Sequence, residues 1–192
     1  FSSISESLRG GFFLWPREFT VSAYQSIFRT SGLTTSFKNS VIVTVIGTAL
    51  SVILTAATAY PLTKKFLLGH RVVSGLILFT MLFGGGLIPT YLLVKSFRMV
   101  NTLWALIIPG CISAYNVFVM MSFFRSLPIE LEESAFIDGA NPVKIFFLIV
   151  LPLSMPVLAT VSLWEAVGQW NNFSGALIYL NNQENFTLPI FV

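Results

Sequence analysis

Few residues in this chain are of the types that carry out covalent or acid–base chemistry. The sequence has a single histidine, His70, and a single cysteine, Cys111, among 192 residues. A Ser–His–acid triad would depend on His70 alone. One cysteine is too few for an intrachain disulfide, and one cysteine with one histidine is too few for a His/Cys metal cluster. The Gly-x-x-x-x-Gly-Lys-Ser/Thr phosphate-binding loop of ATPases is also missing. The sequence therefore predicts a protein that binds or transports, with no catalytic or metal site of its own.

The polar residues with the most informative spacing lie between two apolar runs, at positions 133–139 and 149–152. Pro128 is suited to the first turn of a helix, and acidic side chains near a helix N-terminus are favoured by the helix dipole. Gly139 is the residue type that commonly ends a helix, and Asn141 is a typical N-cap for a following helix. We therefore predict a short helix, a tight turn and a second helix. The acidic residues of the first helix are Glu130, Glu132 and Glu133.

The elements that must position this segment are apolar helices. Only 10% of the residues are charged and the mean hydropathy is +0.81, whereas soluble domains carry about 25% charged residues. The composition therefore predicts an all-α, polytopic membrane helical bundle. The net charge of +3 is mild and forms no basic stripe, so no nucleic-acid partner is expected. Four runs are long enough to span a bilayer, namely 40–60, 72–94, 103–124 and 146–166.

Small residues and helix breakers mark three of these runs. The run 40–60 is rich in Ser, Thr, Ala and Gly, which predicts close packing against other helices. Glycines at 84–86 allow either a functional unwinding of the helix or close packing with an early helix end, and we favour the second. Pro152 and Pro156 are expected to interrupt the last run, because proline removes a helical hydrogen bond.

The segment 167–192 is rich in aromatic and amide side chains, and Glu165 and Gln169 lie just before or within it. Aromatic faces stack on the C–H faces of sugars, and amides pair with hydroxyl groups. Tryptophan also anchors helices at membrane interfaces, so this alternative remains open for the same residues. The candidate carbohydrate contacts are Trp170, Asn171 and Asn172.

The segment 133–152 resembles the EAA loop found in permease subunits of bacterial ABC importers. The family pattern is Glu-Ala-Ala, three residues, Gly, nine residues, Ile, any residue and Leu-Pro, and the spacing here matches it throughout. Ser134 stands where the family usually has alanine, which is a small-for-small change. The flanking residues resemble the carbohydrate-uptake branch, the maltose-type second permease, and within it the LplC-type subunits. The matching positions are Glu133, Ala135, Gly139, Ile149, Leu151 and Pro152.

The resemblance implies a type I ABC importer permease fold with four spans in this fragment and six in the full subunit. It implies that residues 1–39 and 167–192 lie outside the cytoplasm and that 126–145 forms a cytoplasmic coupling loop. The residues expected to couple to an ATPase are Glu133, Ser134, Ala135, Asp138, Gly139, Ile149, Leu151 and Pro152. Glu133 and Asp138 are candidates for ion pairs with basic ATPase residues, and Gly139 would set the angle between the two short helices.

The same resemblance implies partners that this chain does not contain. These are a second homologous permease, two ATPase subunits that bind ATP and magnesium, and an extracytoplasmic solute-binding protein. The substrate would be a carbohydrate, and the location the bacterial inner membrane, in contact with lipid. The alternative is a secondary transporter or channel without an ATPase. Such proteins place ionisable residues inside their spans, whereas here only Glu165 is expected, at the edge of one.

Overall fold

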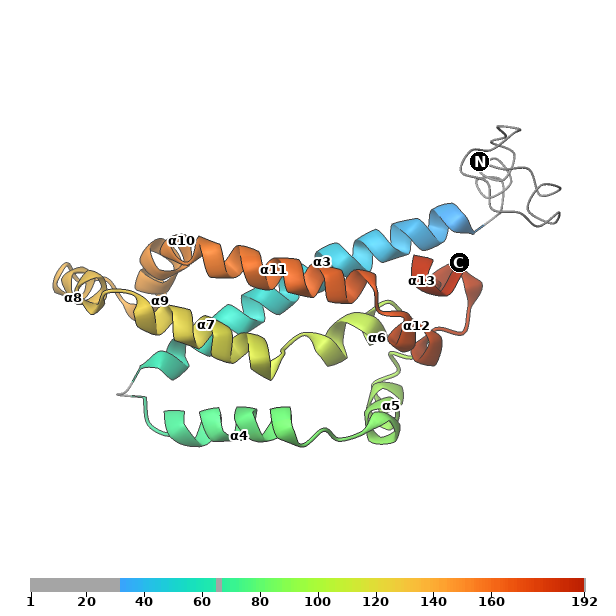
Figure 1. The fold of residues 1–192 in the computed structure, drawn as a ribbon, viewed down its shortest axis with the longest axis horizontal. Helices are drawn as coiled ribbons and strands as arrows, with labels where there is room; N and C mark the ends of the chain where they lie inside the picture. The colour runs from blue at the N-terminus through green and yellow to red at the C-terminus, as the bar shows by residue number, and fades with distance from the viewer. Residues whose placement is uncertain (1–31, 65–66, 192) are drawn as a thin grey trace, which may run out of the picture.

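The computed structural model describes residues 32–64 and 67–191, and all regular structure among them is helical. The longest helices lie along one axis, with α8 at one end of the bundle and α12 and α13 at the other (Figure 1). Residues 1–31, most of the segment expected outside the cytoplasm, lie outside the described residues. The elements are α3 (Leu33–Thr63), α4 (His70–Leu82), α5 (Leu87–Ser96), α6 (Trp104–Ile107), η1 (Ile108–Gly110), α7 (Ala114–Ser126), α8 (Ile129–Ile137), α9 (Pro142–Ile145), η2 (Phe146–Val150), α10 (Leu151–Leu153), α11 (Met155–Trp170), α12 (Phe173–Tyr179), η3 (Gln183–Asn185) and α13 (Leu188–Phe191).

Helix α3 is the central element of the bundle. Its 31 residues correspond to roughly 46 Å at the usual helical rise, longer than the hydrocarbon core of about 30 Å. The helix begins at Leu33, earlier than the expected residue 40. It also continues past Pro61 to Thr63. The buried face repeats small residues about every four positions, and the close packing expected from this composition is present. Its members include Ser36, Ser40, Gly47, Ser51, Thr55 and Ala59.

Helices α11 and α7 pack extensively against α3. Two groups of buried side chains result. One lies towards α8 and includes Tyr60, Met120, Phe124, Ile145 and Val161. The other lies towards α12 and includes Val43, Val94, Leu106, Ile107, Cys111 and Tyr179.

Each of the other three predicted spans consists of two helical parts joined at a bend. The pair α4 and α5 is bent by 115°, the pair α6–η1 and α7 by 51°, and the pair α9–α10 and α11 by 78°. Among the described residues only α3 is long and apolar enough to cross a membrane by itself, and four spans result if each bent pair counts as one. The last bend falls at Ser154, between the two prolines that were expected to interrupt the helix.

The glycines at 84–86 end α4 but do not serve close packing within the described chain. A Cβ placed on Gly84 or Gly85 would meet no atom of this chain within 4 Å. Gly86 adopts φ 83° and precedes α5, a conformation that favours glycine. Helix α4 itself has no buried residue, so its apolar side chains remain on the surface of this chain.

Candidate functional site

The predicted helix–turn–helix is present at the α8 end of the bundle (Figure 1). Helix α8 ends where the Gly139 amide donates to the Phe136 carbonyl (3.0 Å) and the Ala140 amide to the Ala135 carbonyl (2.9 Å). This is a Schellman turn, which requires a left-handed residue, and Gly139 supplies it at φ 81°. Asn141 then caps α9, as its side chain accepts a hydrogen bond from the Lys144 amide (2.8 Å). Two local signals in the sequence therefore determine the whole turn.

The eight residues expected to contact an ATPase fall into two groups. Glu133, Ser134, Asp138 and Gly139 are exposed on α8 and its turn, together with the strongly exposed apolar side chains Ile129 and Ile137. Ala135 is buried, and Ile149 and Leu151 pack against the same core, whereas Pro152 is exposed on α10. Acidic and apolar side chains thus share one surface of α8, a composition that suits a protein partner.

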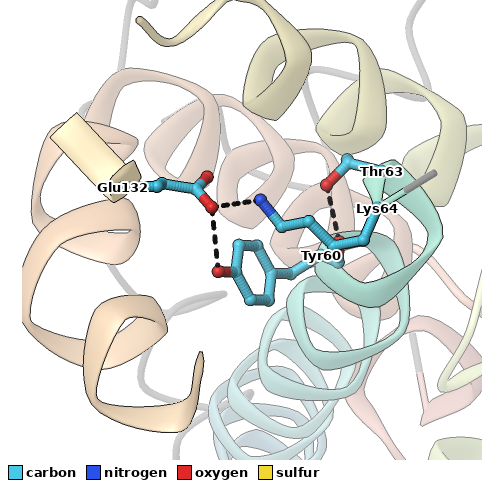
Figure 2. A network of polar contacts seen from close by, with 4 residues as sticks. All are labelled: Tyr60, Thr63, Lys64 and Glu132. Atoms are coloured by element: carbon cyan, nitrogen blue, oxygen red, sulfur yellow. Dashed lines mark hydrogen bonds and ion pairs between the residues drawn. The ribbon is translucent and has the colours of Figure 1, made fainter. Parts of the chain in front are cut away.

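Glu132, which sequence reasoning treated only as a favourable first-turn acid, makes the main polar contact between α8 and the bundle. Its carboxylate pairs with the Lys64 ammonium at the end of α3 and accepts a hydrogen bond from the Tyr60 hydroxyl at 3.3 Å (Figure 2). Glu132 and Ala135 are three residues apart and so share the inner face of α8. That spacing could have indicated an inward-facing carboxylate, although it could not have identified its partner.

The three predicted carbohydrate contacts do not share one surface. Trp170 packs edge-on against Phe37 of α3, with ring centroids 6.1 Å apart. Asn171 is exposed and donates to the Val167 carbonyl at 2.8 Å. Asn172 caps α12 by accepting from the Gly175 amide at 3.0 Å. The separation follows from helix geometry, because consecutive residues point in different directions.

Asn172 lines a cavity of about 380 Å³ between α11, α12 and the α6–η1 segment. Glu165 and Gln169, noted in the sequence only as neighbours of the candidate contacts, line it as well. The Asn116 amide donates to the Glu165 carboxylate at 2.5 Å, and Gln169 lies against Gly47 of α3. Glu165 lies within α11, five residues before its end at Trp170. No Lys or Arg of the described chain lines the cavity.

A metal or redox centre would need clustered ligands. Within residues 32–64 and 67–191, no three His, Cys, Asp or Glu side chains lie together in a metal-binding arrangement. His70 begins α4, where its Nδ1 lies 3.0 Å from the Leu67 carbonyl oxygen. Cys111 is buried, and its thiol donates to the Ile107 carbonyl at 3.1 Å.

Proteins of known families are similar to this chain in sequence and in fold. Over nearly its full length the chain is 44% identical to protein LplC of Bacillus subtilis, of which it covers 64%. It is also 44% identical to the polygalacturonan/rhamnogalacturonan transport system permease protein YtcP of the same organism, of which it covers 67%. The chain thus spans about two thirds of the length of these relatives.

A solved structure gives the same result for the fold. One match is the crystal structure of a bacterial ABC transporter involved in the import of the acidic polysaccharide alginate. The match covers 99% of this chain and 68% of the transporter chain, with a TM-score of 0.95 and 32% sequence identity. This match confirms the all-α, type I importer permease fold that the EAA-like spacing predicted. Residues 41–191, almost the whole described region, match the sequence model of one protein family. The chain therefore belongs to the binding-protein-dependent transport system inner membrane components.

Proposed function

We propose that this chain is part of a permease subunit of an ATP-driven, binding-protein-dependent carbohydrate importer in the bacterial inner membrane. The observation that carries the proposal is the exposed acidic and apolar surface of α8, held in a fixed turn by Gly139. Family membership and the names of the polysaccharide-transporting relatives support it. The chain would be non-catalytic, and separate ATPase subunits would bind ATP and magnesium.

The partners follow from the surfaces that this chain leaves uncovered. One of the two ATPase subunits would dock at α8 and the other at the second permease, and a solute-binding protein would deliver the sugar at the α12–α13 end. A second homologous permease would cover apolar surface such as that of α4, which has no buried residue in this chain. Lipid would cover the remainder of that surface.

Closure of the ATPases would move α8, and two connections would pass the movement on. One runs through Gly139 into α9 and then, past the bend at Ser154, into α11. The other is the contact of Glu132 and Ala135 with the end of α3 and its core. Because packed helices prefer discrete arrangements, such a movement would switch the bundle between inward-open and outward-open states.

The cavity beside α11 and α12 is the part of this chain best suited to contact the sugar. Glu165, Gln169 and Asn172 offer carboxylate and amide groups that can pair with hydroxyl groups. We propose that Asn172, which lines the cavity, contacts the translocated carbohydrate, and that Trp170 and Asn171 contact it from outside the cavity. Alanine at these positions should lower uptake while the complex still assembles.

The experiment is purification of the full-length permease after co-expression with its partner permease, ATPase and binding protein. Glu133→Lys places a cation on the exposed face of α8 where the proposal expects basic ATPase residues. Leaving a buried charge unpaired costs about 2–5 kcal/mol at comparable interfaces, so ATPase recovery should fall sharply. Glu184→Lys is the matched control, because Glu184 is an exposed glutamate at the opposite end of the bundle. Equal recovery in both variants would contradict the ATPase-docking proposal.

Glu165 supports a second candidate function, that of a secondary transporter driven by an ion gradient. A carboxylate within α11, paired with Asn116, is the kind of intramembrane group that ion-coupled transporters use. Uptake that an ion gradient drives in vesicles without ATP, with no copurifying ATPase, would favour this secondary transporter over the importer.

A further inference from the structure

The contact between Glu132 and the end of α3 is built from three polar groups on two elements distant in sequence. Glu132 lies on α8, whereas Tyr60 and Lys64 lie 72 and 68 residues earlier (Figure 2). The Lys64 ammonium also sits over the Tyr60 ring, 4.4 Å from its centroid. We refer to Tyr60, Lys64 and Glu132 together as the latch.

The latch is shielded from solvent. The side chains of Lys64 and Glu132 are only 21% and 14% exposed. A shielded ion pair is screened less by salt than a surface pair, and losing one member leaves the other unpaired. The Tyr60 ring is itself fixed, since it packs against Phe124 of α7 and Phe146 of η2 at centroid distances of 6.3 and 4.9 Å. Glu132 is therefore bound to a rigid point where three parts of the bundle meet.

The rest of α8 is weakly anchored. Ala135 is its one buried residue, and its methyl group can contribute little packing. Ile137 is 87% exposed, and Glu133 and Asp138 on the outer side are exposed as well. The orientation of the outer face thus depends largely on the inner face, where Glu132 supplies the main polar contact described above.

We propose that Glu132 is a positioning residue that, through Tyr60 and Lys64, fixes α8 to α3 so that movement of one helix is transmitted to the other. This inference rests on the proposed function, because it takes α8 as the surface that an ATPase moves. Neighbouring glutamates would then have separate tasks. Glu133 faces the partner, whereas Glu132 faces the membrane helices and determines how rigidly they follow.

The test uses the full-length permease in its complex with the partner permease and ATPase, reconstituted in proteoliposomes with the binding protein. Three single variants open the latch in different ways: Glu132→Gln, Lys64→Met and Tyr60→Phe. For each, ATPase recovery, sugar-stimulated ATP hydrolysis and sugar uptake are measured on the same preparation. The decisive quantity is the amount of sugar imported per ATP hydrolysed.

Glu132→Gln and Lys64→Met should retain the ATPase, since the latch lies on the inner face of α8, but should lower uptake per ATP roughly 2- to 30-fold. Tyr60→Phe removes one hydrogen bond and keeps the ion pair, so its effect should be the smallest. The double variant Lys64→Glu with Glu132→Lys restores opposite charges and should recover part of the coupling. A role in folding alone would instead lower the yield and leave the ratio unchanged.

Glu130→Gln is the matched control, because Glu130 is in the same first turn and makes no ion pair with another described residue. Equal uptake per ATP in Glu132→Gln, Glu130→Gln and the unaltered protein would overturn the latch. So would an equal loss in Glu130→Gln and Glu132→Gln, because negative charge near the ATPase would then explain both. If the unaltered permease recovers no ATPase at all, the proposed function itself fails, and this outcome is distinct from both.

Discussion

The two ends of the bundle are held together in different ways. At the α8 end, contacts within the turn join residues three to five positions apart, as in the bonds of Gly139 and Ala140 to the end of α8. At the α12–α13 end, amide side chains join segments far apart in the chain. Asn39 donates to the carbonyls of Glu184 and Phe186, 145 and 147 residues away, at 2.8 and 3.0 Å.

The most connected of these amides is Asn101. Its side-chain oxygen accepts from the amides of Asn181 and Asn182, and its backbone oxygen accepts from the Asn185 side chain at 2.7 Å. Ser40 of α3 accepts from the Leu188 amide in the same region. The α12–α13 end is thus fixed to α3 and to the loop before α6, whereas helix α8 is attached to the bundle through the latch and the buried Ala135, and its turn leads into α9, where Ile145 is buried in the core.

This difference indicates how each end can take part in transport. A locally built turn keeps its shape when it moves, so α8 and α9 can shift together without losing internal hydrogen bonds. The opposite end cannot shift without breaking several long-range bonds. We therefore expect substitutions in the amide network to affect the stability of the fold, and substitutions in the α8 turn to affect coupling.

The largest effect on stability is expected at Asn101. Asn101→Leu removes two hydrogen bonds worth about 1 kcal/mol each, and leucine at φ 64° adds roughly 1 kcal/mol of backbone strain. The midpoint of thermal unfolding of the detergent-solubilised permease should fall accordingly. Asn101→Gly keeps the backbone conformation accessible and so isolates the hydrogen bonds. A midpoint for Asn101→Leu equal to that of Asn181→Ala, an exposed neighbour, would contradict the proposed importance of the network.

A smaller effect on stability and a larger one on coupling are expected at Gly139. Gly139→Val places a β-branched side chain at φ 81°, which costs about 1–2 kcal/mol. A Cβ there meets no atom within 4 Å, so the loss comes from the backbone and not from a clash within this chain. Sugar-stimulated ATP hydrolysis should be uncoupled from uptake while the permease still inserts. Normal uptake per ATP in Gly139→Val would show that the angle of the turn is unimportant, and Gly139→Ala should give a weaker form of the same defect.

The contrast between the two ends also explains which features the sequence predicted. Gly139 and Asn141 are local signals, so the helix–turn–helix could be predicted before any tertiary structure was known. The many small side chains of the run 40–60 likewise predicted that α3 packs against other helices, although the four-residue spacing of its buried face became visible only in the structure. The partners of Glu132 and Asn101 could not be predicted, since they depend on how distant segments meet. The bend angles of the broken spans depend on neighbouring helices in the same way, although glycine and proline marked where the breaks occur.

The smallest effect is expected at Asn172, where a local contact lies at the end dominated by distant ones. Its side chain caps α12 by accepting from the Gly175 amide, and it also lines the cavity beside α11. Asn172→Ala removes the cap at a typical cost of about 1 kcal/mol, which should lower the thermal midpoint less than Asn101→Leu does.

The two tasks of Asn172 can be separated by a second substitution at the same position. Asn172→Asp keeps an oxygen that can accept from Gly175, so it should restore the thermal midpoint, but it removes the amide donor from the cavity and adds a negative charge near Glu165. If the cavity contacts the sugar, Asn172→Asp should therefore be stable and still impaired in uptake. Recovery of both the midpoint and the uptake would assign Asn172 to helix capping alone, because uptake would then not depend on the amide donor that Asn172→Asp removes. Local structure at this end would in that case serve the fold, and the sugar path would have to run elsewhere.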